Sequence, residues 1–317
     1  MKNLVIIGKV FPEPNSTAAG SRMIQLMDLF LTQNYQITFL STATISENSF
    51  DLSSKNISFQ NIVLNDSSFD ELIKNLNPEI VIFDRFTTEE QFGWRVSEQV
   101  PNAVKILDTE DLHFLRTARE KAFKQNRNLE HLDLINDVFK REIASILRCD
   151  LSLIISEFEM NLLIEKFRID ENILFYLPLF GEVKKPETSF SERKNFISIG
   201  NFLHEPNWQT VLQLKKLWKN IKNQLQEAEI HIYGAYASEK VFQLHNEKEG
   251  FIIKGRAENV ESVFSQAKVL LAPIPFGAGI KGKLLESMQF GLPNVTSAVG
   301  AEAMHGNLDW NGFITDN

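Results

Sequence analysis

Short apolar stretches rich in β-branched residues alternate with longer segments of helical periodicity along the whole chain. This alternation is typical of βαβ units, in which helices connect parallel strands. In the first half it predicts strands at Leu4–Ile7, Gln36–Leu40, Ile57–Val63, Ile80–Phe83, Val104–Leu107 and Leu151–Ile155. Helices are expected between them, among others at Arg22–Leu31, Phe69–Leu76 and Leu129–Leu147.

The alternation stops in a polar stretch, residues 182–194, which contains Pro186 and shows no apolar periodicity, and we interpret it as a linker. It restarts with strands expected at Phe196–Ile199, Glu229–Tyr233, Phe251–Lys254, Val269–Ala272 and Asn294–Thr296, and with a short sixth strand at Phe313–Ile314. The pattern predicts an α/β protein with two Rossmann-like doubly wound domains, residues 1–181 and 195–317, facing each other across a cleft. Ligands of such domains bind beyond the carboxyl ends of the strands.

Composition narrows the classes of protein. With 317 residues, 43% hydrophobic and 23% charged, the chain is typical of globular proteins. A net charge of −8 argues against a nucleic-acid partner. The longest uncharged apolar stretch, from Val269 to Ile280, is too short to span a membrane, and the N-terminus is unlike a signal peptide, so we expect a cytoplasmic protein. The single cysteine, Cys149, is expected to pack in the interior.

The most informative segment is PIPFGAGIKGKLLESMQFGLP at residues 273–293, where a glycine-rich turn follows a predicted strand and a helix begins near Lys283. Gly279 and Gly282 allow a ligand to approach the backbone, and Lys281 and Lys283 add positive charge to the amides of a helix N-terminus. Together these features suit a pyrophosphate. An ordinary βα turn with two solvated lysines is the alternative.

Glu286, one turn into this helix, is placed to accept hydrogen bonds from ribose hydroxyls. The segment, with GNFLHEPN at 200–207 and TSAVGAE at 296–302, resembles the donor-binding half of GT-B retaining glycosyltransferases of the family-4 type. The resemblance extends over nearly the whole chain and implies that Gly200 and Asn201 belong to the donor site. It also implies that Glu286 is the ribose-binding second glutamate of the Glu-x7-Glu motif, whose first glutamate is replaced by Ala278.

The arginine and lysine that this family usually carries after the first strand of its donor domain are missing from residues 200–207. We therefore expect Lys281 and Lys283 to contact the donor phosphates in their place.

In the first half, DTEDLHFLR at residues 108–116 follows the strand predicted at Val104–Leu107. The resemblance implies that His113, with Asp111 beside it, faces the donor sugar and orients it or stabilises developing charge. In the alternative interpretation Asp111 caps a helix and His113 is merely packed. The acidic residues here follow no metal-ligand spacing, and GT-B enzymes as a class need no divalent ion, so we expect neither a metal nor a cofactor.

Two further loops are candidates for acceptor binding. Asp84 and Arg85 follow the strand Ile80–Phe83, while Gly20 and Arg22 lie at the end of the first βα loop. Ordinary surface connections are the alternative for both loops. The first loop lacks Gly-x-Gly-x-x-Gly, which argues against a nicotinamide or flavin dinucleotide.

A basic run follows His113 and is suited either to an anionic lipid surface or to a solvated helix face; its members are Arg116, Arg119, Lys121, Lys124 and Arg127.

The resemblance implies a retaining, metal-independent transferase that moves a sugar from a nucleotide diphosphate sugar to a glycan or lipid-linked acceptor in polysaccharide or glycoconjugate assembly. Residues 1–181 would then be the acceptor side and residues 195–317 the donor domain.

A non-catalytic nucleotide- or sugar-binding protein is the alternative, favoured by Ala278 and by the short second half. GT-B proteins usually continue with further helices, so we expect the donor domain to be truncated and the sequence to be a fragment.

Overall fold

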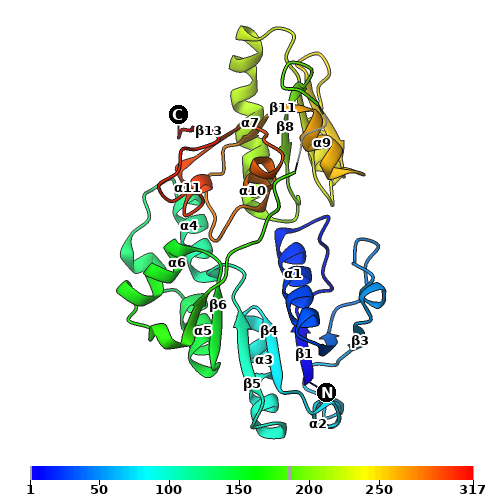
Figure 1. The fold of residues 1–317 in the computed structure, drawn as a ribbon. Helices are drawn as coiled ribbons and strands as arrows, with labels where there is room; N and C mark the ends of the chain where they lie inside the picture. The colour runs from blue at the N-terminus through cyan, green and yellow to red at the C-terminus, as the bar shows by residue number, and fades with distance from the viewer. Residues whose placement is uncertain (1, 185–187, 317) are drawn as a thin grey trace. The chain divides into compact units, whose positions relative to one another are not determined.

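The computed structural model describes residues 2–184 and 188–316 and divides the chain into two compact units, each built on a parallel β-sheet (Figure 1). The first unit contains most of the chain up to Leu179. The second contains the chain from Phe180 onwards, together with two short segments, Ser16–Ala18 and Arg119–Arg127.

The sheet of the first unit has the strand order β3-β2-β1-β4-β5-β6-β7, and every pairing is parallel. The strands are β1 (Lys2–Gly8), β2 (Tyr35–Ser41), β3 (Ser58–Asn61), β4 (Ile80–Asp84), β5 (Val104–Asp108), β6 (Leu151–Ile154) and β7 (Leu174–Tyr176). The helices that connect them are α1 (Ala18–Thr32), α2 (Ser68–Leu76), α3 (Phe86–Gln99), α4 (His113–Lys124), α5 (Asp137–Arg148) and α6 (Glu157–Asn161).

Strand β1 shows why the apolar pattern predicts strands correctly. Leu4, Val5, Ile6 and Ile7 are all buried, as expected where helices cover both faces of a parallel sheet. Each of the strands predicted in this half is present. Strand β7 was not predicted, because two of its three residues are exposed and it offers no buried apolar run.

The helix predicted at Leu129–Leu147 was wrong over its first part. Helix α5 begins only at Asp137, and the chain before it forms a short 3₁₀ turn at His131–Leu134. Asn136 accepts a hydrogen bond from the amide of Phe139 at 3.0 Å and so caps the helix. A side chain that accepts from a first-turn amide in this way determines where a helix starts, even where the apolar periodicity begins earlier.

The sheet of the second unit has the order β10-β9-β8-β11-β12-β13 and is also parallel. Its strands are β8 (Lys194–Ile199), β9 (Ile230–Tyr233), β10 (Phe251–Gly255), β11 (Ala267–Ala272), β12 (Asn294–Thr296) and β13 (Gly312–Ile314). Its helices are α7 (Glu205–Gln224), α8 (Glu239–Phe242), α9 (Val260–Gln266), α10 (Gly282–Gln289) and α11 (Ala298–Ala301). All six predicted strands are present, including the short last one.

Both sheets reverse their strand order next to their first strand, between β1 and β4 and between β8 and β11. The predicted fold class, α/β with doubly wound parallel sheets, is therefore confirmed. In such sheets the carboxyl ends of the strands at the reversal form the ligand site. The predicted linker, residues 182–194, includes residues 185–187, which lie outside the described residues, and its last residue already belongs to β8.

Candidate functional site

The predicted donor residues of the second unit gather at the reversal between β8 and β11. Gly200 and Asn201 follow β8 directly, and residues 279–281 are the last part of the loop that connects β11 to α10. Parallel neighbours end at the same edge of a sheet, so the two loops lie side by side there. The structure thus brings together residues that are about eighty positions apart in the sequence.

The N-cap side chain of α10 does not hydrogen-bond the first amides of the helix. Lys281 occupies the N-cap position and has no acceptor atom, so its side chain cannot satisfy the first amides, and no acidic residue lies in the first turn. The Lys281 side chain, only 8% exposed, turns back and donates to the carbonyl of Gly279 at 2.8 Å. Gly279 adopts φ +62°, a left-handed conformation that favours glycine.

Lys283 connects α10 to the loop after β8. Its Nζ donates to Asn207 Oδ1 at 2.8 Å, and Asn207 Nδ2 donates to the carbonyl of Asn201 at 3.0 Å. A Cβ on Gly200 would lie 2.7 Å from both Asn207 Cγ and Lys283 Nζ, so glycine is required for these side chains to approach the strand end. Asn207 was not predicted as a site residue, because an asparagine in the first turn of a helix carries no sign of a binding role in the sequence.

Lys283 and Glu286 lie one turn apart on α10 and are both half-buried. Burial lowers the pKa of Lys283 to about 8, against the opposing effect of the Glu286 charge. Burial raises the pKa of Glu286 to about 7, while Lys283 and Lys184 oppose the rise. Both groups titrate near neutral pH, as functional groups often do.

In the first unit, the predicted acceptor residues follow β1 and β4. Asp84, 4% exposed, accepts from the amide of Lys9 at 3.2 Å, and its other oxygen lies 3.4 Å from Arg85 Nε. Arg85 has φ +72°, which is strained for a side chain with a Cβ. Its amide donates to the carbonyl of Asp108 at 2.8 Å, which ties this residue to β5.

The other two predicted acceptor residues have clear structural contacts. Arg22, 2% exposed, forms an ion pair with fully buried Asp108 at 2.9 Å and donates to the carbonyl of Leu177 at 2.7 Å. Gly20 packs so closely on the first loop that a Cβ there would lie 2.4 Å from the backbone of Glu13. Whether either residue also binds an acceptor stays a prediction.

His113 is the first residue of α4, and its ring is fixed on one side. Its Nδ1 lies 3.0 Å from the carbonyl of Asp111, and because a carbonyl can only accept, we assign a proton to Nδ1. The Phe86 ring packs edge-on against the imidazole at 5.4 Å. The carboxylate of Asp111 pairs with Arg116.

A buried glutamate that the sequence did not reveal supports this histidine. Glu142, fully buried on α5, accepts from the amides of His113 at 3.1 Å and Phe114 at 2.9 Å, and its Oε1 lies 3.3 Å from His113 Nδ1. From the sequence, a glutamate in the middle of an amphipathic helix is expected on the solvated face of that helix. Its burial depends on where α4 and α5 meet.

Acidic side chains gather around the end of β5. Burial raises the pKa of Glu110 well above its usual value; the Arg85 charge opposes the rise, and Asp108 and Asp84 add to it. Within residues 2–184 and 188–316, no group of three or more His, Cys, Asp or Glu side chains is arranged to hold a metal ion.

Much of the basic run is neutralised by neighbouring carboxylates. Arg119 forms a two-point ion pair with Glu302, at 2.8 and 2.7 Å, and Lys124 pairs with Glu120. Arg116 pairs with Asp111, as described above. No helix in the described part of the chain combines the length and hydropathy that a membrane crossing requires.

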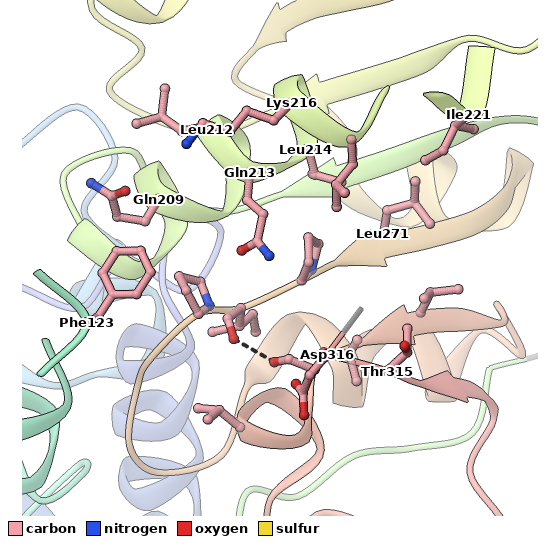
Figure 2. A pocket seen from close by; sticks show the side chains of 18 of the residues that line it. Phe123, Gln209, Leu212, Gln213, Leu214, Lys216, Ile221, Leu271, Thr315 and Asp316 are labelled. Atoms are coloured by element: carbon pink, nitrogen blue, oxygen red, sulfur yellow. Dashed lines mark hydrogen bonds between the residues drawn. The ribbon is translucent and has the colours of Figure 1, made fainter. Parts of the chain in front are cut away.

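A groove of about 700 Å³ lies elsewhere in the second unit, between α7 and the ends of β11 and β12 (Figure 2). Leu212, Ile221 and Leu271 give it an apolar wall, and Thr315 and Asp316 lie at its other side. None of the predicted donor residues lines it. The groove reaches the first residues of the loop after β11, residues 273–275, but none of the glycines and lysines predicted to bind the donor.

Solved structures with a similar fold identify the fold class of the chain. The chain is similar to a glycosyltransferase from Rickettsia africae ESF-5, at 11% identity and TM-score 0.68, over 99% of this chain and 84% of that one. It is similar to a sucrose-phosphate synthase from Thermosynechococcus elongatus, at 13% identity and TM-score 0.70, over 95% and 82%. HepE from Anabaena in complex with UDP aligns at 10% identity and TM-score 0.69, over 99% and 85%. No curated protein matches the sequence significantly.

These structures and the two doubly wound sheets define the fold as that of the GT-B glycosyltransferases. Residues 193–317 match the family model described as "Glycosyl transferases group 1". The predicted resemblance to GT-B glycosyltransferases is therefore confirmed for the fold, and residues 200–207, 273–293 and 296–302 lie within the segment that matches the glycosyltransferase model. The assignment to retaining enzymes of the family-4 type stays a prediction.

Proposed function

We propose that the chain is a retaining, metal-independent glycosyltransferase that transfers a sugar from a nucleoside diphosphate sugar to a glycan or lipid-linked acceptor. One observation carries the proposal: an uncapped helix start, two lysines and Glu286 converge at the strand-order reversal of the second unit. This cluster lies inside the segment that matches the group 1 family model. That HepE was solved with UDP is consistent with a uridine diphosphate donor.

In this proposal the donor diphosphate binds the first amides of α10 and the ammonium groups of Lys281 and Lys283, and Glu286 accepts from the ribose hydroxyls. Gly200 leaves room for the Lys283 ammonium to reach the end of β8. Positive charge at the diphosphate stabilises the leaving nucleotide, so no cofactor and no metal are invoked.

His113 would present Nε2 to the sugar and orient it, with Asp111 holding the ring through its carbonyl. The bond between the anomeric carbon and the diphosphate oxygen breaks, and the acceptor oxygen bonds to the same face of that carbon. The acceptor proton passes to the leaving phosphate. Asp84 and Arg85 would contact the acceptor.

Donor binding is tested by thermal unfolding with UDP, GDP and ADP. The correct nucleotide should raise the unfolding temperature in proportion to ln(1 + [L]/Kd). Lys283→Ala and Glu286→Ala should reduce the rise, whereas Lys240→Ala on α8 serves as an exposed control in the same unit. If no nucleotide stabilises the protein, the donor site is refuted.

Catalysis is tested by donor hydrolysis and by transfer to glycan and lipid-linked acceptors. The anomeric configuration of the product, measured by NMR, should match that of the donor, and the rate should survive EDTA. His113→Ala should lower kcat by about 10²-fold or more. An unchanged kcat would remove His113 from the mechanism, and an inverted product would refute the retaining assignment.

A non-catalytic nucleotide- or sugar-binding protein is a second candidate, because Ala278 stands where the family's first glutamate contacts the donor sugar. Such a protein would be stabilised by UDP but would neither hydrolyse nor transfer a UDP-sugar. Ala278→Glu is the matched variant: a gain of turnover on this substitution would support a transferase that has lost one contact.

We place this activity in the cytoplasm, with contact to the inner face of the membrane through Lys121, Lys124 and Arg127. Flotation with anionic vesicles tests the contact, and a protein that stays unbound at low salt would exclude it. The ion pairs of Arg116, Arg119 and Lys124 leave less charge for lipid than the sequence indicates.

A further inference from the structure

We infer that Asn207 is a positioning residue, which holds the Lys283 ammonium over the end of β8 where the donor diphosphate binds. The inference rests on the proposed function and adds to it a residue on α7 that acts through Lys283.

The oxygen and the nitrogen of the Asn207 side-chain amide both form hydrogen bonds. Its oxygen accepts from Lys283 Nζ at 2.8 Å, and its nitrogen donates to the Asn201 carbonyl at 3.0 Å. These two bonds fix the orientation of the amide, because a carbonyl can only accept and an ammonium can only donate. The Asn207 amide also donates from the main chain to the carbonyl of His204 at 2.9 Å, which anchors the residue in the first turn of α7.

Lys283 has a competing partner on its own helix. Glu286 lies three residues further along α10, a spacing at which opposite charges attract across one turn. The hydrogen bond from Nζ nevertheless goes to Asn207, and Glu286 acts on Lys283 through its charge. Asn207 thus holds the Lys283 ammonium next to the turn after β8 and away from the Glu286 carboxylate.

Gly200 leaves the space in which this contact forms. A side chain at this position would overlap both Asn207 and Lys283, because its Cβ would lie 2.7 Å from each. Three segments, the end of β8, the start of α7 and the start of α10, therefore meet at one ammonium group. A lysine held in this way loses little conformational entropy when an anion binds.

The test is a double-mutant cycle on UDP affinity, measured by isothermal titration calorimetry at pH 7. Wild type, Asn207→Ala, Lys283→Ala and the double variant are compared, and all four are checked for folding by thermal unfolding without nucleotide. Asn220→Ala is the matched control, an exposed asparagine further along α7. Asn207→Ser provides a second variant should the alanine be poorly folded.

Asn207→Ala should weaken UDP binding about tenfold in wild type and less than twofold in the Lys283→Ala background. Asn207→Asp should weaken it further than alanine, because a carboxylate would then face the diphosphate. Asn220→Ala should leave the affinity unchanged.

Equal losses in both backgrounds would show that Asn207 does not act through Lys283 and would overturn the inference, while UDP binding by wild type would still support the proposed function. If wild type bound neither UDP, GDP nor ADP, the proposed function itself would fall, and the inference with it.

Discussion

Replacement of Glu286 by glutamine should make the second unit more stable while weakening its binding of UDP. Burial raises the pKa of this carboxyl from its ordinary value of 4.5 to about 7. The folded state therefore holds the proton more tightly than the unfolded state, and stability falls as the pH rises from about 4.5 to about 7. The full difference corresponds to about 3 kcal/mol, and solvent around the half-buried carboxylate reduces the expected effect to about 1–2 kcal/mol.

The assay is urea unfolding at pH 5 and pH 8, followed by tryptophan fluorescence. Three of the four tryptophans, Trp208, Trp218 and Trp310, lie in the second unit, so the signal reports mainly on its unfolding. Wild type should lose stability between the two pH values, whereas Glu286→Gln should lose less and should exceed wild type at pH 8. Glu227→Gln, at an exposed position of the same unit, is the control.

The same variant should bind UDP less tightly at pH 8, because an amide oxygen is a weaker acceptor for ribose hydroxyls than a carboxylate. If wild type and Glu286→Gln showed the same change in unfolding free energy between pH 5 and pH 8, the assignment of a raised pKa to this carboxyl would be refuted. A more stable variant with unchanged UDP affinity would instead separate Glu286 from the ribose.

Three further variants test the first unit by urea unfolding. Arg22→Met leaves the Asp108 carboxylate buried without its ion-pair partner and should cost about 3–5 kcal/mol, much of which Arg22→Met with Asp108→Leu should recover; equal losses in both variants would contradict this. Asn136→Ala removes the cap of α5 and should cost about 1 kcal/mol, and no loss would show that the cap is dispensable. Glu142→Gln turns an amide NH₂ toward a backbone N–H and should cost about 1–3 kcal/mol, whereas Glu142→Asp should retain part of that stability; a neutral glutamine variant would contradict this account.

The elements that sequence reasoning found are those whose burial is local in origin. The strand at Leu4–Ile7 is apolar at every position because helices cover both its faces, and the turn at residues 273–293 carries its glycines and lysines within one short segment. The start of α5 was misplaced because Asn136 competes with periodicity through a single hydrogen bond. Strand β7 pairs with β6 while exposing two of its three side chains, which leaves no buried apolar run in the sequence.

The candidate site divides in the same way. The positions of Lys281, Lys283 and Glu286 after a strand could be predicted, and the structure places them at the strand-order reversal. Their partners could not, because Asn207 lies 76 residues from Lys283 in the sequence and meets it only when α7 and α10 have both packed on the sheet. Glu142 likewise reaches the amide of His113 across 29 residues.

The amides at the start of α4 have a consequence for anion selectivity. Glu142 accepts from two of them, and Glu159 accepts from the amide of Leu112 at 3.0 Å, so the positive end of this helix is already filled by carboxylates of the chain itself. An incoming phosphate would have to displace a covalently tethered competitor, whose effective concentration far exceeds that of any free metabolite. At α10 the N-cap residue is Lys281, whose side chain has no acceptor atom for the first amides. We therefore expect an anion to bind at the start of α10 and not at the start of α4.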